Sequence, residues 1–225
     1  MDDAVDFLPL YLRFIRGIID SSDLPLNVSR EILQDHPLVE SIKKALTKRV
    51  VDALKKLKDN DIDAYKEFWK EYGLVLKEGP AEDSEHRESI AELLLFATSN
   101  KETHDVDQTL DDYISRMPSD QKGIYYCVAD TFEGALNSPH LESLKSKNTE
   151  VLLLTDRIDE WLMSSLFEFK GKSFINVAKT SNEAEVKPKT TKDQNELLKK
   201  VANHLGDRVS EVLPSSRLKD SACCL

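Results

Sequence analysis

The 225-residue sequence has few of the residues that covalent cross-links, metal sites and phosphate loops require. Its three cysteines are too few for a disulfide framework. Its five histidines are scattered along the chain, so we expect no metal site. The sequence contains no GxxxxGKS or GxGxxG phosphate loop and no GxSxG or HExxH motif of a hydrolase. It therefore gives no support for a hydrolase or transferase that works alone.

Long apolar runs and an excess of positive charge are missing as well. No stretch of about 18 apolar residues occurs, which argues against a transmembrane helix. The N-terminus, Met1-Asp2-Asp3, is acidic where a signal peptide would be basic. The 41 acidic and 31 basic residues give a net charge of -10, which argues against nucleic acid as a partner. We therefore expect a cytoplasmic protein that binds neither nucleic acid nor membrane.

Residues 1–98 contain a succession of helical patterns. Apolar residues at spacings of three and four predict four helices, over 4–18, 37–58, 61–72 and 84–97. Gly73 is the expected end of the third helix. The second helix carries seven basic residues against two acidic ones. This pattern favours a solvated surface, and the alternative is a docking surface for an acidic partner or another domain.

Residues 99–180 alternate between strand and helix patterns. Apolar runs predict three strands, over 124–129, 150–154 and 172–178. A helix is expected over 156–169, and the polar residues 99–107 are expected to form a linker before this unit. Such alternation is typical of a small, mainly parallel sheet with helices on its faces. We therefore predict an α/β protein in which 99–180 form a small αβα unit with its own core.

Residues 181–225 form the third expected region. Its first residues are rich in Lys, Glu, Thr and Ser and predict a linker. Thr191 caps a predicted helix that ends at Gly206. A candidate strand follows over 209–213.

A polar loop follows the first predicted helix and carries one arginine, Arg30. Pro25 fixes its own backbone and disfavours a helix before it, and Asn27 favours a turn. Glu31 and Gln34 lie at the start of the next helical pattern. The planar guanidinium of Arg30 suits the oxygens of a phosphate on another domain. The alternative is an ordinary surface ion pair, which most loop arginines make.

The loop sequence Asp23-Leu-Pro-Leu-Asn-Val-Ser-Arg-Glu-Ile-Leu-Gln34 resembles the middle-domain catalytic loop of the heat-shock-protein-90 chaperone family, bacterial HtpG type. Other segments resemble the same family in the same order, namely 13–22, 72–83, 113–117, 124–126, 138–141 and 150–161. The resemblance extends from residue 1 to about residue 178 and continues more weakly to the end. It implies the helical remainder of a larger αβα layer unit in 1–98, and the start of the C-terminal dimerisation domain in 181–225.

The resemblance further implies part of an ATP-dependent chaperone whose N-terminal nucleotide-binding domain is absent from this chain. In the full-length parent, that domain would hold ATP with Mg²⁺, and Arg30 would contact the γ-phosphate and stabilise phosphoryl transfer. Asn27 and Gln34 would position Arg30 or contact the N-terminal domain, and Glu31 would orient the guanidinium or favour the helix start. The parent would act as a homodimer on client proteins. The chain alone would be no enzyme and would bind no cofactor.

A second candidate site lies within the predicted helix over 156–169. Trp161, Met163 and Phe167 add more apolar area than one inward stripe needs, the stripe being Ile158, Leu162, Leu166 and Phe169. These extra residues predict either a second packing contact or an exposed patch for unfolded client protein. The family resemblance favours Glu160 and Trp161 as client contacts. A passive binding and scaffolding module, in which Arg30 is structural, remains the alternative function.

Overall fold

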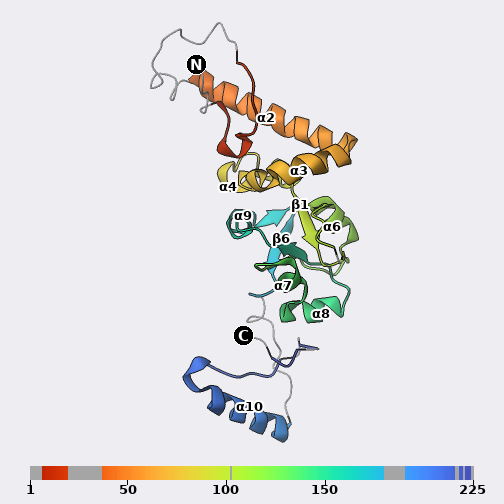
Figure 1. The fold of residues 1–225 in the computed structure, drawn as a ribbon, viewed down its shortest axis with the longest axis vertical. Coiled ribbons are helices and arrows are strands. Elements are labelled where there is room, and N and C mark those ends of the chain that lie inside the picture. Colours follow the sequence, from red (N-terminus) through yellow and green to blue (C-terminus); the bar gives the residue numbers. More distant parts are fainter. Residues whose placement is uncertain are drawn as a thin grey trace.

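The computed structural model describes residues 7–19, 37–101, 103–179, 191–215, 218–219 and 221–223. It confirms an α/β protein with a small, mainly parallel sheet. Figure 1 shows a helical layer at one end, the sheet with surrounding helices in the middle, and α10 at the other end.

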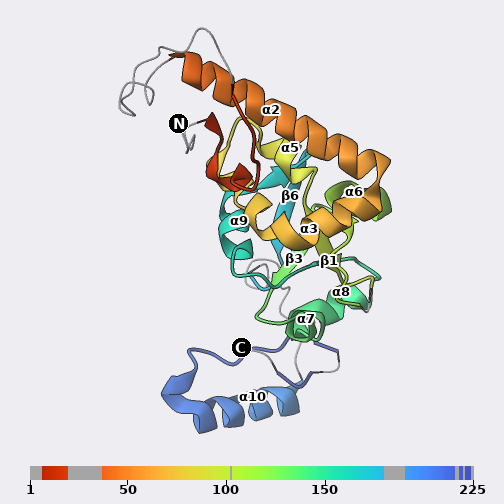
Figure 2. The same cartoon turned by 45° about the horizontal axis from the view of Figure 1, so that its top comes forward.

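The helical layer comes from the first part of the chain. Its elements are η2 (Leu10–Leu12), α2 (Pro37–Asn60), α3 (Ile62–Leu76), α4 (Gly79–Glu82) and α5 (Arg87–Ala91). The long predicted helix over 37–58 is confirmed by α2, which packs against α3 (Figures 1 and 2). Asp61 caps α3 by accepting a 3.0 Å hydrogen bond from the backbone N–H of Ala64, so the chain turns sharply between the two helices.

Six strands form one sheet in the order β2-β1-β4-β3-β6-β5. The strands are β1 (Leu95–Thr98), β2 (Gln108–Thr109), β3 (Ile124–Val128), β4 (Leu152–Leu154), β5 (Glu168–Phe169) and β6 (Lys172–Asn176). The central strand β3 is parallel to both β4 and β6, as predicted, with Cys127 opposite Leu153 and Tyr125 opposite Ile175. Antiparallel pairing adds β1 and β2 at one edge and β5 at the other.

Short helices surround the sheet, several of them beginning at a side-chain cap. They are α6 (Leu110–Arg116), α7 (Phe132–Leu136), η3 (Pro139–Leu141), α8 (Glu142–Lys145) and α9 (Asp159–Ser165). Thr109 and Asp112 form a reciprocal capping box at α6, and Thr131 and Ser138 cap α7 and η3. Residues of α6 and α9 belong to one hydrophobic cluster, so both helices pack on the same face of the sheet.

The C-terminal region holds α10 (Lys192–Leu205) followed by η5 (Gly206–Arg208). Thr191 and Gln194 form the predicted capping box, and Gly206 ends the helix with a positive φ of 56°. The strand expected over 209–213 is not formed. Because no strand of the sheet pairs with this segment, its backbone has no ladder of hydrogen bonds to join.

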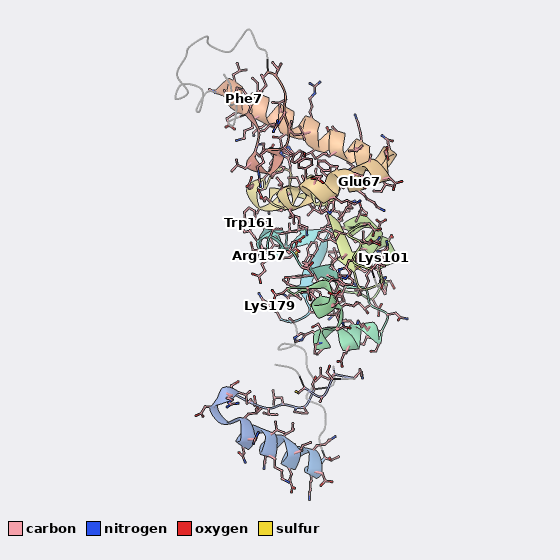
Figure 3. All side chains as sticks on the ribbon, in the orientation of Figure 1. Phe7, Glu67, Lys101, Arg157, Trp161 and Lys179 are labelled. Atoms are coloured by element: carbon pink, nitrogen blue, oxygen red, sulfur yellow. The ribbon has the colours of Figure 1, made fainter. Side chains whose placement is uncertain are left out.

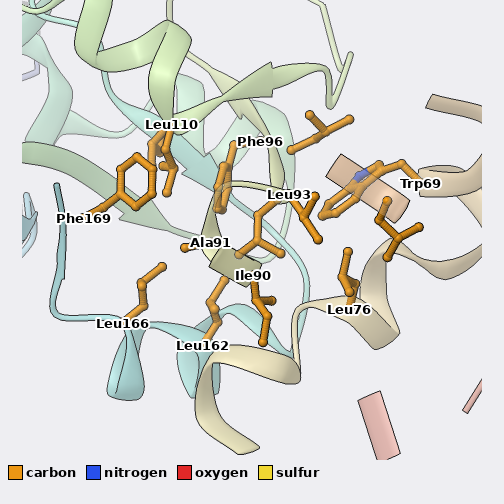
Figure 4. Close-up of a cluster of buried hydrophobic side chains, with 14 of the residues drawn as sticks. Trp69, Leu76, Ile90, Ala91, Leu93, Phe96, Leu110, Leu162, Leu166 and Phe169 are labelled. Carbon is orange, nitrogen blue, oxygen red and sulfur yellow. The ribbon is translucent and has the colours of Figure 1, made fainter. Parts of the chain in front are cut away.

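One hydrophobic cluster connects the helical layer with one face of the sheet. Figure 4 shows this cluster, in which Trp69 and Leu76 of α3 and Ile90 of α5 lie near Phe96 of β1 and Leu162 of α9. The expected separate core of 99–180 is therefore wrong for this face. A second cluster covers the other face and includes Cys127, Phe132, Leu141 and Leu153, so only that face has a core made almost entirely by 99–180.

The helix predicted over 84–97 is replaced by the short helix α5 and the strand β1. Residues 93–98 are all buried, so no side of this segment faces water. Apolar spacing of three and four fits these residues, but a continuous buried run is typical of a strand covered on both faces. The misreading comes from the ambiguity of short apolar runs.

Three further predicted helices have different bounds. In place of a helix over 4–18, the described residues hold only η2, preceded by the extended residue Pro9, and Ile18 is 97% exposed. Helix α3 continues through Gly73 to Leu76. Glycine is needed at this position because the indole of Trp69 covers it and a Cβ there would lie 2.7 Å from the ring. The helix expected over 156–169 is the shorter α9, since Phe169 pairs within the sheet as part of β5.

Glu92, at the end of α5, connects three distant elements. Its carboxylate pairs with Lys55 of α2 and with Lys170 in the turn between β5 and β6, the latter at 3.3 Å. Burial alone would raise the pKa of Glu92, but hydrogen bonds from both lysines hold it below its usual value of 4.5. Because the folded state has the lower pKa, this contribution to stability is complete above the usual value and is lost as the pH falls through the lowered one.

We predict that Glu92→Gln lowers the free energy of unfolding by roughly 0.5–1 kcal/mol at neutral pH. The difference from the unchanged chain should shrink at an acidic pH below the lowered pKa of Glu92, where Glu92 itself takes up a proton. Urea unfolding at both pH values measures it. Glu71→Gln, at an exposed position of α3, is the control and should have little effect at either pH. A loss of equal size at both pH values would contradict this account.

Candidate functional site

The four candidate residues of the polar loop, Arg30, Asn27, Glu31 and Gln34, lie outside the described residues. Their proposed roles therefore stay predictions. The structure does describe the segments on both sides of the loop, which are 7–19 and the helix α2.

The segment before the loop is fixed onto α4 and the end of α3. Tyr11 is fully buried, and its hydroxyl donates a 2.9 Å hydrogen bond to Asp83 Oδ2. Burial, reinforced by the negative charge of Asp83, raises the pKa of Tyr11 well above its ordinary value, so the hydroxyl remains a donor. The two terminal nitrogens of the Arg13 guanidinium donate hydrogen bonds to the carboxylate of Glu78, and the bond from Nη2 to Oε1 is 2.7 Å long. Tyr11 and Arg13 thus fix this segment, whereas residues 16–19, which lead into the candidate loop, are exposed.

The second candidate site is held by a buried ion pair. The ammonium of Lys77, at the end of α3, lies 2.7 Å from Asp159 Oδ1 and 2.7 Å from Asp156 Oδ2. Asp159 is the first residue of α9 and is fully buried, and its other oxygen accepts a 2.9 Å hydrogen bond from the backbone N–H of Asp156. The start of α9 is thereby attached to the end of α3.

This attachment leaves one side of α9 facing solvent. Leu162 and Leu166 are buried in the core, as the predicted inward stripe requires. Trp161, labelled in Figure 3, is 42% exposed, and Glu160 next to it is exposed as well. Met163 is partly buried and packs against the core. The structure thus brings Glu160 and Trp161 to the surface together and places Met163 in an intermediate position.

A groove beside α3 is a feature that sequence reasoning missed. It has a volume of about 950 Å³ and lies between α3 and residues 104–107. Trp69, Leu74 and Lys77 line its α3 side, and Asp156 lines it near the start of α9. The pair of Lys66 on α3 with Asp107 joins the two walls, and no local sequence pattern indicates this long-range contact.

The described residues contain no group of three or more His, Cys, Asp or Glu side chains suited to holding a metal ion. None of the helices in the described ranges has the length and apolar character needed to cross a bilayer.

Trp161 thus lies half-exposed on a helix whose first residue shares Lys77 with the groove. The sequence model of the family described as "Hsp90 protein" matches residues 1–225, and the chain belongs to this family. The resemblance found from the sequence is thereby confirmed.

Curated relatives agree with this assignment. The chain is 51% identical over 229 residues to "Chaperone protein HtpG" of Klebsiella pneumoniae and over 230 residues to that of Salmonella typhi. It is also 51% identical over 229 residues to "Chaperone protein HtpG" of Cronobacter sakazakii. Each match covers 98% of this chain and 37% of the relative, so the chain spans little more than a third of their length.

The buried ion pair gives a prediction about stability. Lys77→Met should lower the free energy of unfolding by about 3 kcal/mol, because the buried carboxylate of Asp159 loses its cation. The same substitution at Lys70, which forms a solvent-exposed pair with Glu67, should have little effect on stability. Urea unfolding at neutral pH measures both variants.

Adding Asp159→Asn to Lys77→Met provides the decisive comparison. The amide removes the unpaired charge and still accepts a hydrogen bond from the Asp156 N–H, so the double variant should regain part of the lost stability. The account is wrong if Lys77→Met costs no more than Lys70→Met.

Proposed function

We propose that this chain is part of an ATP-dependent molecular chaperone and that α9 contributes to its client-binding surface. The observation that supports this best is the exposed Trp161 on a helix fixed by the Lys77–Asp159 pair, in a chain of the Hsp90 family. A large aromatic side chain on a rigid element gives much contact area at a low entropic cost. Glu160 adds a carboxylate at the same place, and Met163 adds an adaptable apolar side chain at its border.

The second part of the proposal concerns ATP. In the full-length parent, Arg30 contacts the γ-phosphate of ATP–Mg²⁺ held by an N-terminal ATPase domain. Asn27 and Gln34 position Arg30 or contact that domain, and Glu31 orients the guanidinium. On this proposal, the positive charge of Arg30 stabilises the transferred phosphoryl group electrostatically. The match of residues 1–225 to the Hsp90 family supports such a role.

The parent acts in the cytoplasm as a homodimer on this proposal, and the chain alone is no ATPase. Clients are proteins in unfolded or partly folded states, because these expose the apolar side chains that an aromatic patch can cover.

We predict that Trp161→Ala weakens client binding about tenfold, as expected for an aromatic contact in a binding surface. The probe is reduced, carboxymethylated α-lactalbumin carrying a fluorescent label, and its anisotropy with increasing chain concentration measures binding. Tyr72→Ala is the control, because Tyr72 is an aromatic residue of similar exposure, 40%, on α3. Trp161→Phe should retain most of the affinity. Equal affinities of the Trp161→Ala variant and the unchanged chain would exclude α9 as a client surface.

We predict that Arg30→Ala in the full-length parent slows ATP turnover by at least about 100-fold and leaves nucleotide affinity nearly unchanged. Steady-state phosphate release and binding of a fluorescent ATP analogue separate the two effects. Arg16→Ala, at an exposed arginine of the segment before the loop, is the control and should leave turnover unchanged. Unchanged turnover in the Arg30→Ala variant would favour the alternative, a passive binding module in which Arg30 is structural.

A further inference from the structure

The groove beside α3, with walls from α3 and from residues 104–107, has a donor that the protein itself does not use. Trp69 lines the groove and is almost fully buried, with its indole ring lying over Gly73. Its indole N–H donates a hydrogen bond to no acceptor in the described ranges. This N–H is not one of the buried polar atoms that lack a partner, so solvent reaches it and an acceptor that enters the groove can bind it.

The charges that line the groove leave an excess of carboxylates. Each lysine of its lining has a partner within it, because Lys66 pairs with Asp107, Lys70 with Glu67 and Lys77 with Asp156. Two further carboxylates of the lining, those of Asp63 and Asp105, have no cation partner among the described residues. The groove therefore favours a ligand with positive charge.

The apolar lining and the neighbouring sheet edge indicate an extended ligand. Leu74 is 57% exposed along one wall, and Val106 is exposed on the other. The wall formed by 104–107 leads directly into β2, which is an edge strand of the sheet. An edge strand can pair with an added extended segment, and side-chain pockets beside it then select the residues.

We propose that this groove binds an extended segment of client polypeptide that carries apolar side chains and at least one lysine or arginine. The Trp69 N–H donates to a carbonyl of that segment, Leu74 and Val106 contact its apolar side chains, and Asp63 and Asp105 attract its cations. The inference rests on the proposed client-binding function and extends it from α9. The two surfaces adjoin, because Asp156 lines the groove and shares Lys77 with Asp159, the first residue of α9.

The test uses the 225-residue chain and two fluorescein-labelled decapeptides, one alternating leucine with lysine and the other leucine with glutamate. Anisotropy titrations at about 0.15 M salt limit the long-range attraction due to the net charge. We expect the leucine–lysine peptide to bind more tightly. Asp63→Asn with Asp105→Asn should weaken its binding about tenfold, roughly threefold for each carboxylate. Asp52→Asn with Asp130→Asn removes the same charge at exposed positions outside the groove and should leave binding nearly unchanged.

A second pair of variants tests the apolar wall. Leu74→Ser should weaken binding roughly threefold or more, because it removes a contact of the bound segment. Leu10→Ser is the matched control, since Leu10 is also 57% exposed but lies on η2 and does not line the groove. Thermal unfolding followed by circular dichroism verifies that all variants fold.

The outcomes separate this inference from the proposed function. If the groove variants bind like their controls while Trp161→Ala still weakens client binding, the groove inference is wrong and the function of α9 stands. If Trp161→Ala also leaves client binding unchanged, both are wrong. If the leucine–lysine and leucine–glutamate peptides bind equally to the unchanged chain, the assigned charge preference is overturned.

Discussion

The buried ammonium group of Lys77 is the interaction on which the arrangement of the two parts of this molecule depends. A cation removed from water must be paired, and both of its carboxylate partners come from residues about 80 positions later in the chain. Lys77 also lies 5.7 Å from the centre of the Phe96 ring on β1. One side chain thus joins the end of α3, the sheet and the start of α9, and any shift of α3 against the sheet would leave a buried charge without its partner.

The hydrophobic core also connects the two parts. It does not divide at the polar residues 99–107, which the sequence predicts to be a linker between two units. Residues 93–96 contribute to the cluster that packs against α3, and β1 also pairs with β4 at the centre of the sheet. Leu162 of α9 belongs to the same cluster, so the helix that carries Trp161 is anchored by both apolar contacts and charge. The exposed face of α9 is for this reason a property of the whole core rather than of a local helix.

Features that depend on residues close together in the sequence were predicted better than features that depend on residues far apart in the sequence. The cap at Thr191 was predicted correctly, because a cap involves residues three positions apart. Gly73 was misread, because the contact that favours a helical glycine there comes from the buried Trp69, whose orientation the sequence does not encode locally. The surface position of Trp161 was one of two predicted alternatives, whereas the groove was not predicted at all. Its walls, on α3 and at 104–107, are joined by the long-range pair of Lys66 with Asp107.

The charge of the chain and the exposure of its aromatic residue are best understood together. An apolar patch large enough to hold unfolded polypeptide is also a site for self-association. The net charge of -10 opposes this, because like-charged copies repel, whereas a client segment carrying lysine or arginine is attracted. Partial exposure of Trp161 limits the hazard further, since only part of the indole surface is in contact with water. On the proposed function, this charge favours a cationic unfolded segment over a second copy of the chain as the partner of Trp161.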